Sequence, residues 1–373
     1  MLPPVPIVLL VVGQVVMRGG VAPPEGDVVA VNAAGVTIRG PSSPARAGTE
    51  HVVSLDRVLD IGGTYQIEWA QQRTNAVDTW RARTRLERGD ILAAEPLFDR
   101  LFEQYRDRTG PTAGVIAEGL LRCRLARHAQ TTAIEPWILL QRAGGPHLFE
   151  SATYRGQPTS LIPSLPPIWL DTPAVDAFAS APLPVDIGAA VADPASARAL
   201  ALAELYHHAA AIACGIDSTL PEQTSRDPDV RFVLHIVLAH EADPKARADA
   251  RLALREVIAK DPEPWVEAWC RAAIGRSLLL EPDTEQRLLG VVQLLHLPAR
   301  LDNEFPYLAG VALAQAAAAI KESGDQNGAD QLHQDLIDEF GGHPALDWAP
   351  IRNWRNAVHS RGATHLTNAP LEG

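Results

Sequence analysis

The chain has 373 residues, of which 46% are hydrophobic and only 5% aromatic, and it carries a net charge of −12. This length allows two or three domains, and the hydrophobic content is ordinary for a globular protein that buries a core. The negative charge argues against nucleic acid as a partner, because a phosphate backbone would be repelled by such a surface.

The chain opens with an apolar run at residues 5–17, which is shorter than the 20 or so residues that a membrane-spanning helix needs. Its length is typical of the hydrophobic part of a signal peptide, and Gly20-Val21-Ala22 offers small residues for cleavage. Against cleavage, no Lys or Arg precedes the run and Pro23 follows. We expect residues 1–22 to be a signal-like or anchoring segment, and the protein to be exported, periplasmic or membrane-anchored. A buried segment or a misassigned start is the alternative, with a cytoplasmic location.

Residues 23–70 are predicted to form a small antiparallel β-module. Short β-branched runs bounded by turn residues predict strands at 27–32, 36–39, 51–55 and 58–61. A module of this size cannot bury a core alone, and we therefore expect it to pack against the helices that follow. The order of strands, with the sequences GVTIR and LDRVLDI, resembles small SH3-like or Sm-like β-barrels at the head of secreted bacterial repeat proteins.

Residues 71–145 are expected to form helix pairs, with the clearest signal at Gly89-Asp90. Gly89 would end one helix and Asp90 would cap the next. Apolar residues then recur at helical spacing and predict one packed stripe. They are Ala94, Leu97, Phe98, Leu101, Phe102 and Tyr105.

This stretch, GDILAAEPLF, resembles the second half of a tetratricopeptide repeat. In that family a Gly-Asp turn is followed by a small residue and then by an aromatic residue four positions later, places that Ala94 and Phe98 fill. The preceding helix fits less well. Trp80 and Ala82 are candidate packing residues, but Arg85 stands where the family usually has an aromatic side chain.

Residues 146–193 contain a cluster of prolines within the sequence LIPSLPPIWLDTP, which also includes Trp169. A flexible linker would not carry so many apolar side chains. We therefore interpret this region as an ordered segment that crosses and packs on the helices. A polyproline ligand for a partner domain and a disordered linker are the alternatives.

Residues 194–356 are expected to continue the helical repeats, ahead of a flexible tail at 357–373. Acid-proline pairs at 193–194, 227–228 and 243–244 predict helix starts, because Asp caps a helix and proline suits its first position. Pro264, Pro306 and Pro344 recur at about 40 residues, within the range of helical solenoids. An irregular helical bundle is the alternative.

The Gly-Asp pattern returns in this region as Gly324-Asp325, followed by Ala329. His333 stands where the tetratricopeptide family has an aromatic residue, so this repeat is degenerate. The resemblance implies a mainly α-helical, tetratricopeptide-like fold of antiparallel helix pairs. Its structural repeat positions would be Gly89, Asp90, Ala94, Phe98, Gly324, Asp325 and Ala329.

No residues stand out as a catalytic, cofactor or metal site. The chain lacks a nucleophile elbow, a Walker loop and a dinucleotide-binding glycine pattern. A metal cluster could be sought among His207, His208, Cys214, His235, His240 and Glu241. His235 and His240 are five residues apart, however, where a helical metal pair needs four. The three cysteines (123, 214 and 270) lie at no motif spacing and favour buried thiols, and the arginines at 81, 83, 85 and 88 favour a solvated face.

We therefore expect a non-enzymatic protein–protein interaction scaffold of the bacterial cell envelope, with no required metal or cofactor. Its partner would be a protein or peptide bound on the curved surface of the helical repeats, and membrane association would involve residues 5–17. The alternative is an enzyme whose site joins scattered residues between the β-module and the helices. The candidates for that site are His128, His147, Asp171 and His207.

Overall fold

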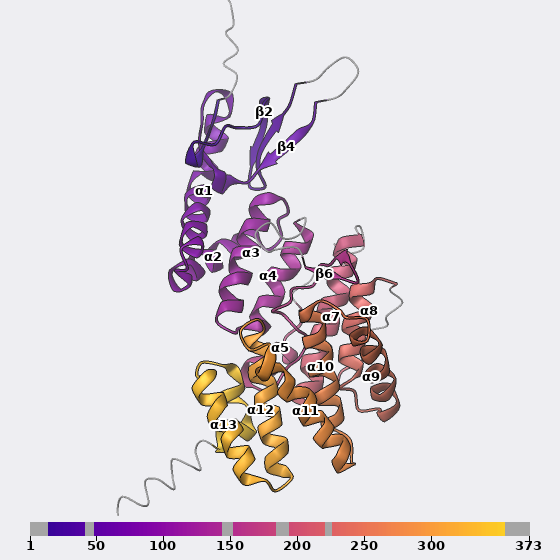
Figure 1. The fold of residues 1–373 in the computed structure, drawn as a ribbon. Helices are drawn as coiled ribbons and strands as arrows, with labels where there is room; N and C mark the ends of the chain where they lie inside the picture. The colour runs from indigo at the N-terminus through magenta and orange to yellow at the C-terminus, as the bar shows by residue number, and fades with distance from the viewer. Residues whose placement is uncertain (1–13, 42–47, 144–151, 184–193, 221–225, 355–373) are drawn as a thin grey trace, which may run out of the picture. The chain divides into compact units, whose positions relative to one another are not determined.

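The structure is a computed structural model that describes residues 14–41, 48–143, 152–183, 194–220 and 226–354. It is mainly α-helical with a small β-module near the N-terminus, which confirms the predicted fold class (Figure 1). The chain divides into two compact units. The first comprises residues 1–127 and 133–150, and the second comprises residues 128–132 and 151–373.

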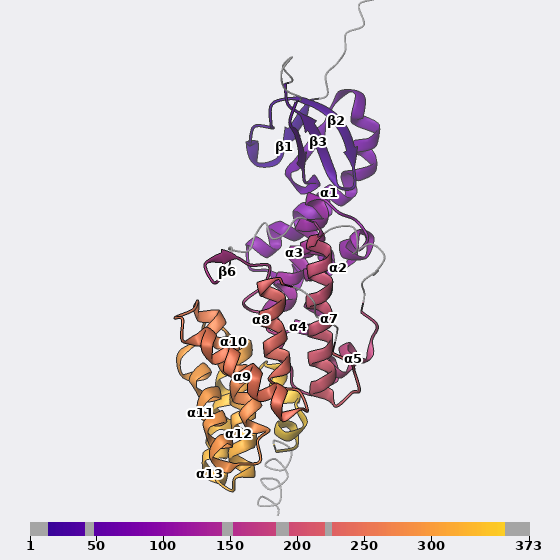
Figure 2. The ribbon, with the colours of Figure 1, turned by 90° about the vertical axis from the view of Figure 1, so that its right-hand side faces the viewer.

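The β-module forms two small antiparallel sheets (Figure 2). One pairs β1 (Val15–Met17) with β5 (Val58–Ile61). The other has the order β2 (Asp27–Asn32), β3 (Gly35–Arg39) and β4 (Glu50–Val53). Four of these strands lie at the predicted positions. The additional strand, β1, falls within the apolar run at residues 5–17, whose remainder up to residue 13 lies outside the described residues.

The core of the β-module includes the first helix, α1 (Gln66–Glu87). Trp69 and Ala76 of this helix are buried among Val36, Ile38 and Leu55 of the module. The indole Nε1 of Trp69 also donates a hydrogen bond to a carboxylate oxygen of Asp60 at 3.0 Å. The strands thus obtain from α1 the apolar surface that so small a module lacks by itself.

Three further helices belong wholly or mostly to the first unit: α2 (Ile91–Tyr105), α3 (Pro111–Ala126) and α4 (Gln130–Arg142). Gly89, with a φ of 78°, makes the turn between α1 and α2. That left-handed conformation costs glycine little. The side chain of Asp90 then caps α2 by accepting a hydrogen bond from the backbone N of Ala93.

Two expectations about α1 were wrong. Trp80 is not a packing residue: it is 39% exposed, and the guanidinium of Arg18 lies 4.7 Å from its ring centre. The predicted solvated arginine face also fails at Arg83. This side chain pairs at 2.8 Å with Asp56, which is buried, so Arg83 compensates a buried charge.

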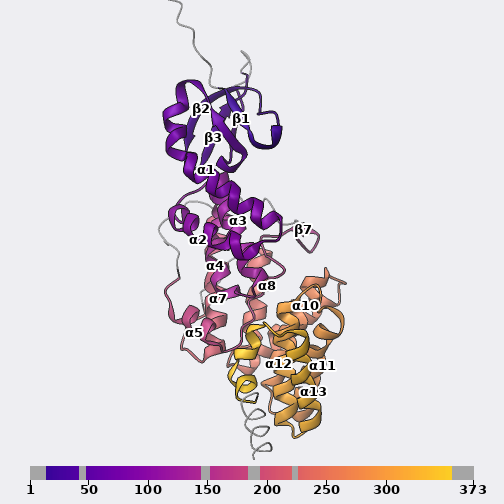
Figure 3. The same ribbon diagram turned by 90° about the vertical axis from the view of Figure 1, so that its left-hand side faces the viewer.

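The second unit is built from consecutive helices that pack against their chain neighbours (Figures 1 and 3). The helices that the structure describes in this unit are α5 (Pro173–Ser180), α7 (Pro194–Cys214), α8 (Pro228–Leu238), α9 (Pro244–Ile258), α10 (Pro264–Leu279), α11 (Thr284–Arg300), α12 (Pro306–Glu322) and α13 (Gln326–Glu339). A short hairpin precedes them, in which β6 (Thr153–Tyr154) pairs with β7 (Gln157–Pro158). Within the described ranges, no helix has both the length and the apolar character needed to cross a bilayer.

The acid-proline pairs begin helices for the expected reason. Asp227 accepts hydrogen bonds from two backbone N–H groups at the start of α8, and Asp243 does the same for α9. Pro228 and Pro244 occupy the first helical positions, where a missing N–H is no loss. Asp193, the third predicted cap, lies outside the described residues.

Candidate functional site

The residues of the two Gly-Asp patterns have structural positions. Gly324, with a φ of 95°, and Asp325, which caps α13, repeat the arrangement of Gly89 and Asp90. Ala94, Phe98 and Ala329 are fully buried. His333, which departs from the family pattern, is also buried and stacks at 4.6 Å on Trp354. These seven positions therefore build turns and helix packing, and none of them forms a polar site.

The most unusual feature of the second unit is the segment 160–172, which forms neither helix nor strand yet is mostly buried. It carries a series of buried apolar side chains: Leu161, Ile162, Leu165, Ile168, Trp169 and Leu170. It belongs to the predicted proline-rich crossing segment and is followed by α5, a helix that was not predicted. Residues 146–151 and 184–193 of that segment lie outside the described residues.

Side chains from α7, α10 and α12 bind the main-chain carbonyl groups of this segment. The hydroxyl of Tyr206 donates to the carbonyl of Leu165 at 2.6 Å, and the indole of Trp269 donates to that of Pro163 at 2.9 Å. The hydroxyl of Tyr307 donates to the carbonyl of Ile168 at 3.1 Å, and the guanidinium of Arg276 donates to that of Trp169 at 2.6 Å.

The start of the segment is fixed by a charged acceptor on α8. A single carboxylate oxygen of Asp229 accepts hydrogen bonds from both the backbone N and the hydroxyl of Ser160, each at 3.0 Å. Asp229 is 4% exposed, so these are buried, charge-assisted hydrogen bonds. Four helices thus contribute at least one side chain each to holding one non-helical stretch of chain.

This arrangement follows from the prolines of the segment. Pro163, Pro166 and Pro167 have no backbone N–H and disfavour helix or inner-strand hydrogen bonding. The neighbouring carbonyl groups are nevertheless buried and need donors. Side chains of the helices supply them, so we call this surface of α7, α8, α10 and α12 the segment groove. The donors of the segment groove therefore contact main-chain atoms of the segment.

Of the four residues proposed for a scattered catalytic site, the three that the structure describes make separate contacts. His128 lies 5.3 Å, ring to ring, from His343, and burial lowers the pKa of both. His207 bonds to the carbonyl of Ala181 at 2.9 Å. Asp171 lies near Cys214, whose pKa is raised first by burial and then by this carboxylate. His147 lies outside the described residues.

Sequence analysis missed one group of catalytic residue types, which joins His208, Ser218 and Glu241. Nδ1 of His208 lies 2.5 Å from the hydroxyl of Ser218, and its Nε2 lies 2.7 Å from a carboxylate oxygen of Glu241. The imidazole is 4% exposed, whereas Ser218 is exposed in the turn after α7. His208 and Glu241 were considered only as metal ligands. Because His208 and Glu241 lie far apart in the sequence, their shared contact with Ser218 through the imidazole could not be predicted from a motif.

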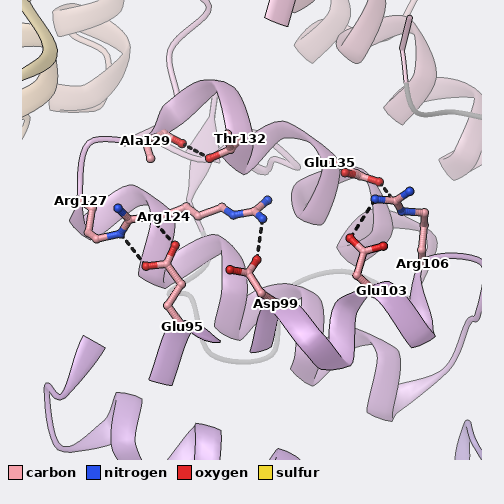
Figure 4. Close-up of polar contacts among 9 residues, drawn as sticks. All are labelled: Glu95, Asp99, Glu103, Arg106, Arg124, Arg127, Ala129, Thr132 and Glu135. Carbon is pink, nitrogen blue, oxygen red and sulfur yellow. Dashed lines mark hydrogen bonds and ion pairs between the residues drawn. The ribbon is translucent and has the colours of Figure 1, made fainter. Parts of the chain in front are cut away.

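The charged side chains of the first unit form ion pairs that connect neighbouring helices (Figure 4). Glu95 of α2 pairs with Arg127, and Asp99 pairs with Arg124 at 2.7 Å. Arg106 bridges Glu103 and Glu135 at 3.2 and 2.8 Å. Each of these carboxylates has an arginine beside it, so the arrangement indicates a structural function.

No group of three or more potential metal ligands occurs among the described side chains. Cys123 and Cys270 are buried as predicted, and burial raises the pKa of both thiols, whereas Cys214 is only partly buried. No protein-family model, curated protein or solved structure matches the chain.

Proposed function

We propose that this protein is a non-enzymatic interaction scaffold of the bacterial cell envelope, built from tetratricopeptide-like helix pairs, and that its second unit binds an extended peptide of a protein partner. Packed helix pairs, the two Gly-Asp turns and the apolar run at residues 5–17 support this proposal. Helical repeats commonly use one curved surface to bind peptides.

The observation that carries the proposal is the occupied segment groove. Tyr206, Trp269 and Tyr307 hold residues 160–172 through backbone carbonyls, which every peptide possesses. The chain itself thus supplies an example of the ligand: a short, apolar, proline-containing peptide. We propose that the partner presents such a peptide and that it exchanges with the chain's own segment.

The net charge of −12 favours a neutral or basic partner, and salt would slow its association. We propose no nucleic-acid partner, because the same charge would repel a phosphate backbone. We propose no metal or cofactor for this mode of binding, because hydrogen bonds and apolar packing of the described residues hold segment 160–172.

A synthetic peptide with the sequence of residues 158–172 tests the exchange. The intact protein should bind the fluorescently labelled peptide weakly, because its own segment competes at high effective concentration. A Trp169→Ala variant, which weakens the internal segment, should bind the same peptide at least tenfold more tightly. A scrambled peptide of equal composition and the exposed Trp80→Ala variant are the controls. Equal, weak binding by both proteins would show that the segment is a permanent part of the core.

A second function is favoured by the contact of Ser218 with His208 and of His208 with Glu241. Such a group can transfer an acyl unit: the serine oxygen attacks a carbonyl carbon while His208 takes its proton, and Glu241 stabilises the resulting imidazolium. His208 then returns the proton to the leaving group. The alternative is a structural role, in which the same hydrogen bonds stabilise the turn after α7.

A fluorophosphonate probe separates these two interpretations. A hydrolase should be labelled at Ser218, should release nitrophenol from p-nitrophenyl acetate, and should lose both properties in Ser218→Ala. Ser323→Ala, at another exposed serine after a helix, is the matched control. Absence of labelling at Ser218 would show that Ser218 is not the nucleophile of a hydrolase.

A further inference from the structure

Arg276 of α10 is a buried cation for which the described residues provide no carboxylate. It is 6% exposed, and its Nη2 donates to the carbonyl of Trp169, while its Nε has no hydrogen-bond partner. Arg247 is equally buried, but it has a carboxylate, Glu281, at 3.5 Å. A buried charge without a counter-charge is costly, so the surroundings of Arg276 suit an anion.

His240 provides a second unused donor beside Arg276. The two side chains are 3.3 Å apart between Nη2 of Arg276 and Nε2 of His240. Because the guanidinium nitrogen can only donate, Nε2 must accept, and the proton of the neutral imidazole then lies on Nδ1. That nitrogen is buried and has no partner. Burial, followed by the charges of Arg276 and Arg247, lowers the pKa of His240 and keeps the ring neutral.

Both residues line a cavity of about 260 Å³ in the second unit. Gln315 of α12 lines it too, and its buried amide oxygen also lacks a partner. Since an amide can turn its NH₂ group towards an acceptor, Gln315 offers a third contact for an anion. The remaining wall is partly apolar, with Leu279, Ala319 and Trp348 among its residues.

The acidic residues of the cavity are otherwise engaged. Glu322 pairs with Arg287 at 2.5 Å, and its side chain is 66% exposed. The carboxylate of Asp171 is hydrogen-bonded to the thiol of Cys214, and no carboxylate is among the groups that shift the pKa of Arg276. The charge of Arg276 persists at neutral pH, because burial lowers its pKa only to about 10.

We propose that this cavity binds a small organic monocarboxylate. The head group would accept hydrogen bonds from Nε of Arg276 and Nδ1 of His240, and an apolar body would lie against Leu279 and Trp348. A carboxylate has the single charge and the paired acceptors that this donor set can satisfy. It can belong to a free acid or to the C-terminal residue of a peptide. The proposal does not depend on peptide exchange in the segment groove.

Thermal unfolding and calorimetry of the full chain with hexanoate test the site. Hexanoate should raise the melting temperature of the second unit by about 5–10 °C at about 100 times its Kd. Hexanol and hexylammonium, which have the same body without the anion, should leave it unchanged. A short Ala-Leu peptide with a free C-terminus, compared with its amide, decides whether a peptide end also fits. Equal shifts with hexanoate and hexanol, or tighter binding of inorganic phosphate, would overturn the carboxylate assignment.

Variants locate the site. Arg276→Met should reduce hexanoate affinity at least tenfold, whereas Arg255→Met, at an exposed position of α9, should leave it unchanged. If Arg276→Met does not fold, Gln315→Glu serves instead, because a fixed carboxylate in the cavity repels the ligand and should also reduce affinity at least tenfold. Gln104→Glu, exposed in the first unit, is its control. Unchanged hexanoate affinity in the folded cavity variant would place the acid elsewhere and refute the proposal.

Discussion

The ring of Phe98 lies directly on the backbone of Gly119, so that a Cβ atom added to Gly119 would stand 2.2 Å from Cζ of Phe98. This contact joins α2 to α3 and explains why a glycine is tolerated in the middle of a helix. The aromatic ring of the Gly-Asp pattern fills the space that the missing side chain leaves. Packing of this closeness makes both residues sensitive to a change of one methyl group.

Gly119→Ala should destabilise the first unit even though alanine is the better helix former. Its methyl group would overlap the ring, and overpacking of this kind costs about 1–3 kcal/mol. Urea unfolding followed by circular dichroism measures the change. In a Phe98→Leu background the smaller side chain can move aside, so the cost of Gly119→Ala should fall there. Equal costs in both backgrounds would show that the ring does not lie on Gly119.

Phe98→Ala should lower the free energy of unfolding of the first unit by about 3–5 kcal/mol, because the ring is fully buried. Leu92→Ala is the control on the same helix, since Leu92 is 79% exposed. Its effect should be within about 0.5 kcal/mol. A melting temperature for Phe98→Ala equal to that of the parent protein would contradict the packing of α2.

How far the sequence predicts this structure depends on the distance over which each signal acts. Asp227-Pro228 and Gly89-Asp90 predict helix ends because a cap and a turn are decided by adjacent residues. β1 could not be predicted, since three apolar residues show no periodicity and their partner, β5, lies some forty residues away. The exposure of Trp80 is likewise set by the tertiary structure, through Arg18.

The candidate site was harder to predict for the same reason. The prolines of segment 160–172 indicated an ordered chain but could not identify the donors that bind it. Tyr206 and Tyr307 come from helices far along the sequence, as do His208 and its partner Glu241. Arg276 looks like any helical arginine in the sequence, and only its burial without a carboxylate distinguishes it.

The segment groove makes a testable contribution to stability. Tyr206→Phe removes the hydroxyl that donates to the buried carbonyl of Leu165 and so takes a hydrogen-bond donor away from that acceptor. The free energy of unfolding should fall by about 1–3 kcal/mol. Tyr307→Phe, which removes the donor to the carbonyl of Ile168, should lower it by a similar amount. Limited proteolysis should cut either variant faster than the parent within residues 160–172. If the variants were cut faster only outside residues 160–172, these hydroxyl groups would not be what holds the segment.

Buried histidines should make the second unit less stable in mild acid. Burial, and then the neighbouring His128, lowers the pKa of His343 to about 3, whereas an unfolded histidine titrates near 6.5. Between these values the unfolded chain binds one more proton, so stability is complete above about pH 6.5 and falls as the pH decreases towards 3. The shifted pKa of His343 should by itself lower the free energy of unfolding by about 2 kcal/mol when the pH falls from 7 to 5.

Urea unfolding at the two pH values measures this loss. His343→Asn keeps an acceptor for the backbone N of Ala345, which His343 caps, but removes the titrating ring. The variant should be less stable at pH 7 yet should lose less stability on acidification. Leu92→Asn, at an exposed position that does not titrate, is the control for an introduced asparagine and should show the same pH dependence as the parent. If His343→Asn also matched the parent, the buried ring would not be the group that titrates.

The last prediction concerns location. The apolar run at residues 5–17 predicts that cell fractionation will find the protein outside the cytoplasm, with a mature N-terminus after about residue 22. Cleavage there would remove β1 and with it the hydrogen-bonding partner of β5, as well as Arg18, which donates to the carbonyl of Val58 at 3.1 Å. Mass spectrometry of the N-terminal peptide decides between cleavage and retention. An uncut N-terminus in the membrane fraction would indicate an anchor, in which β1 is kept. Intact protein beginning at Met1 and confined to the cytosol would remove the argument for export.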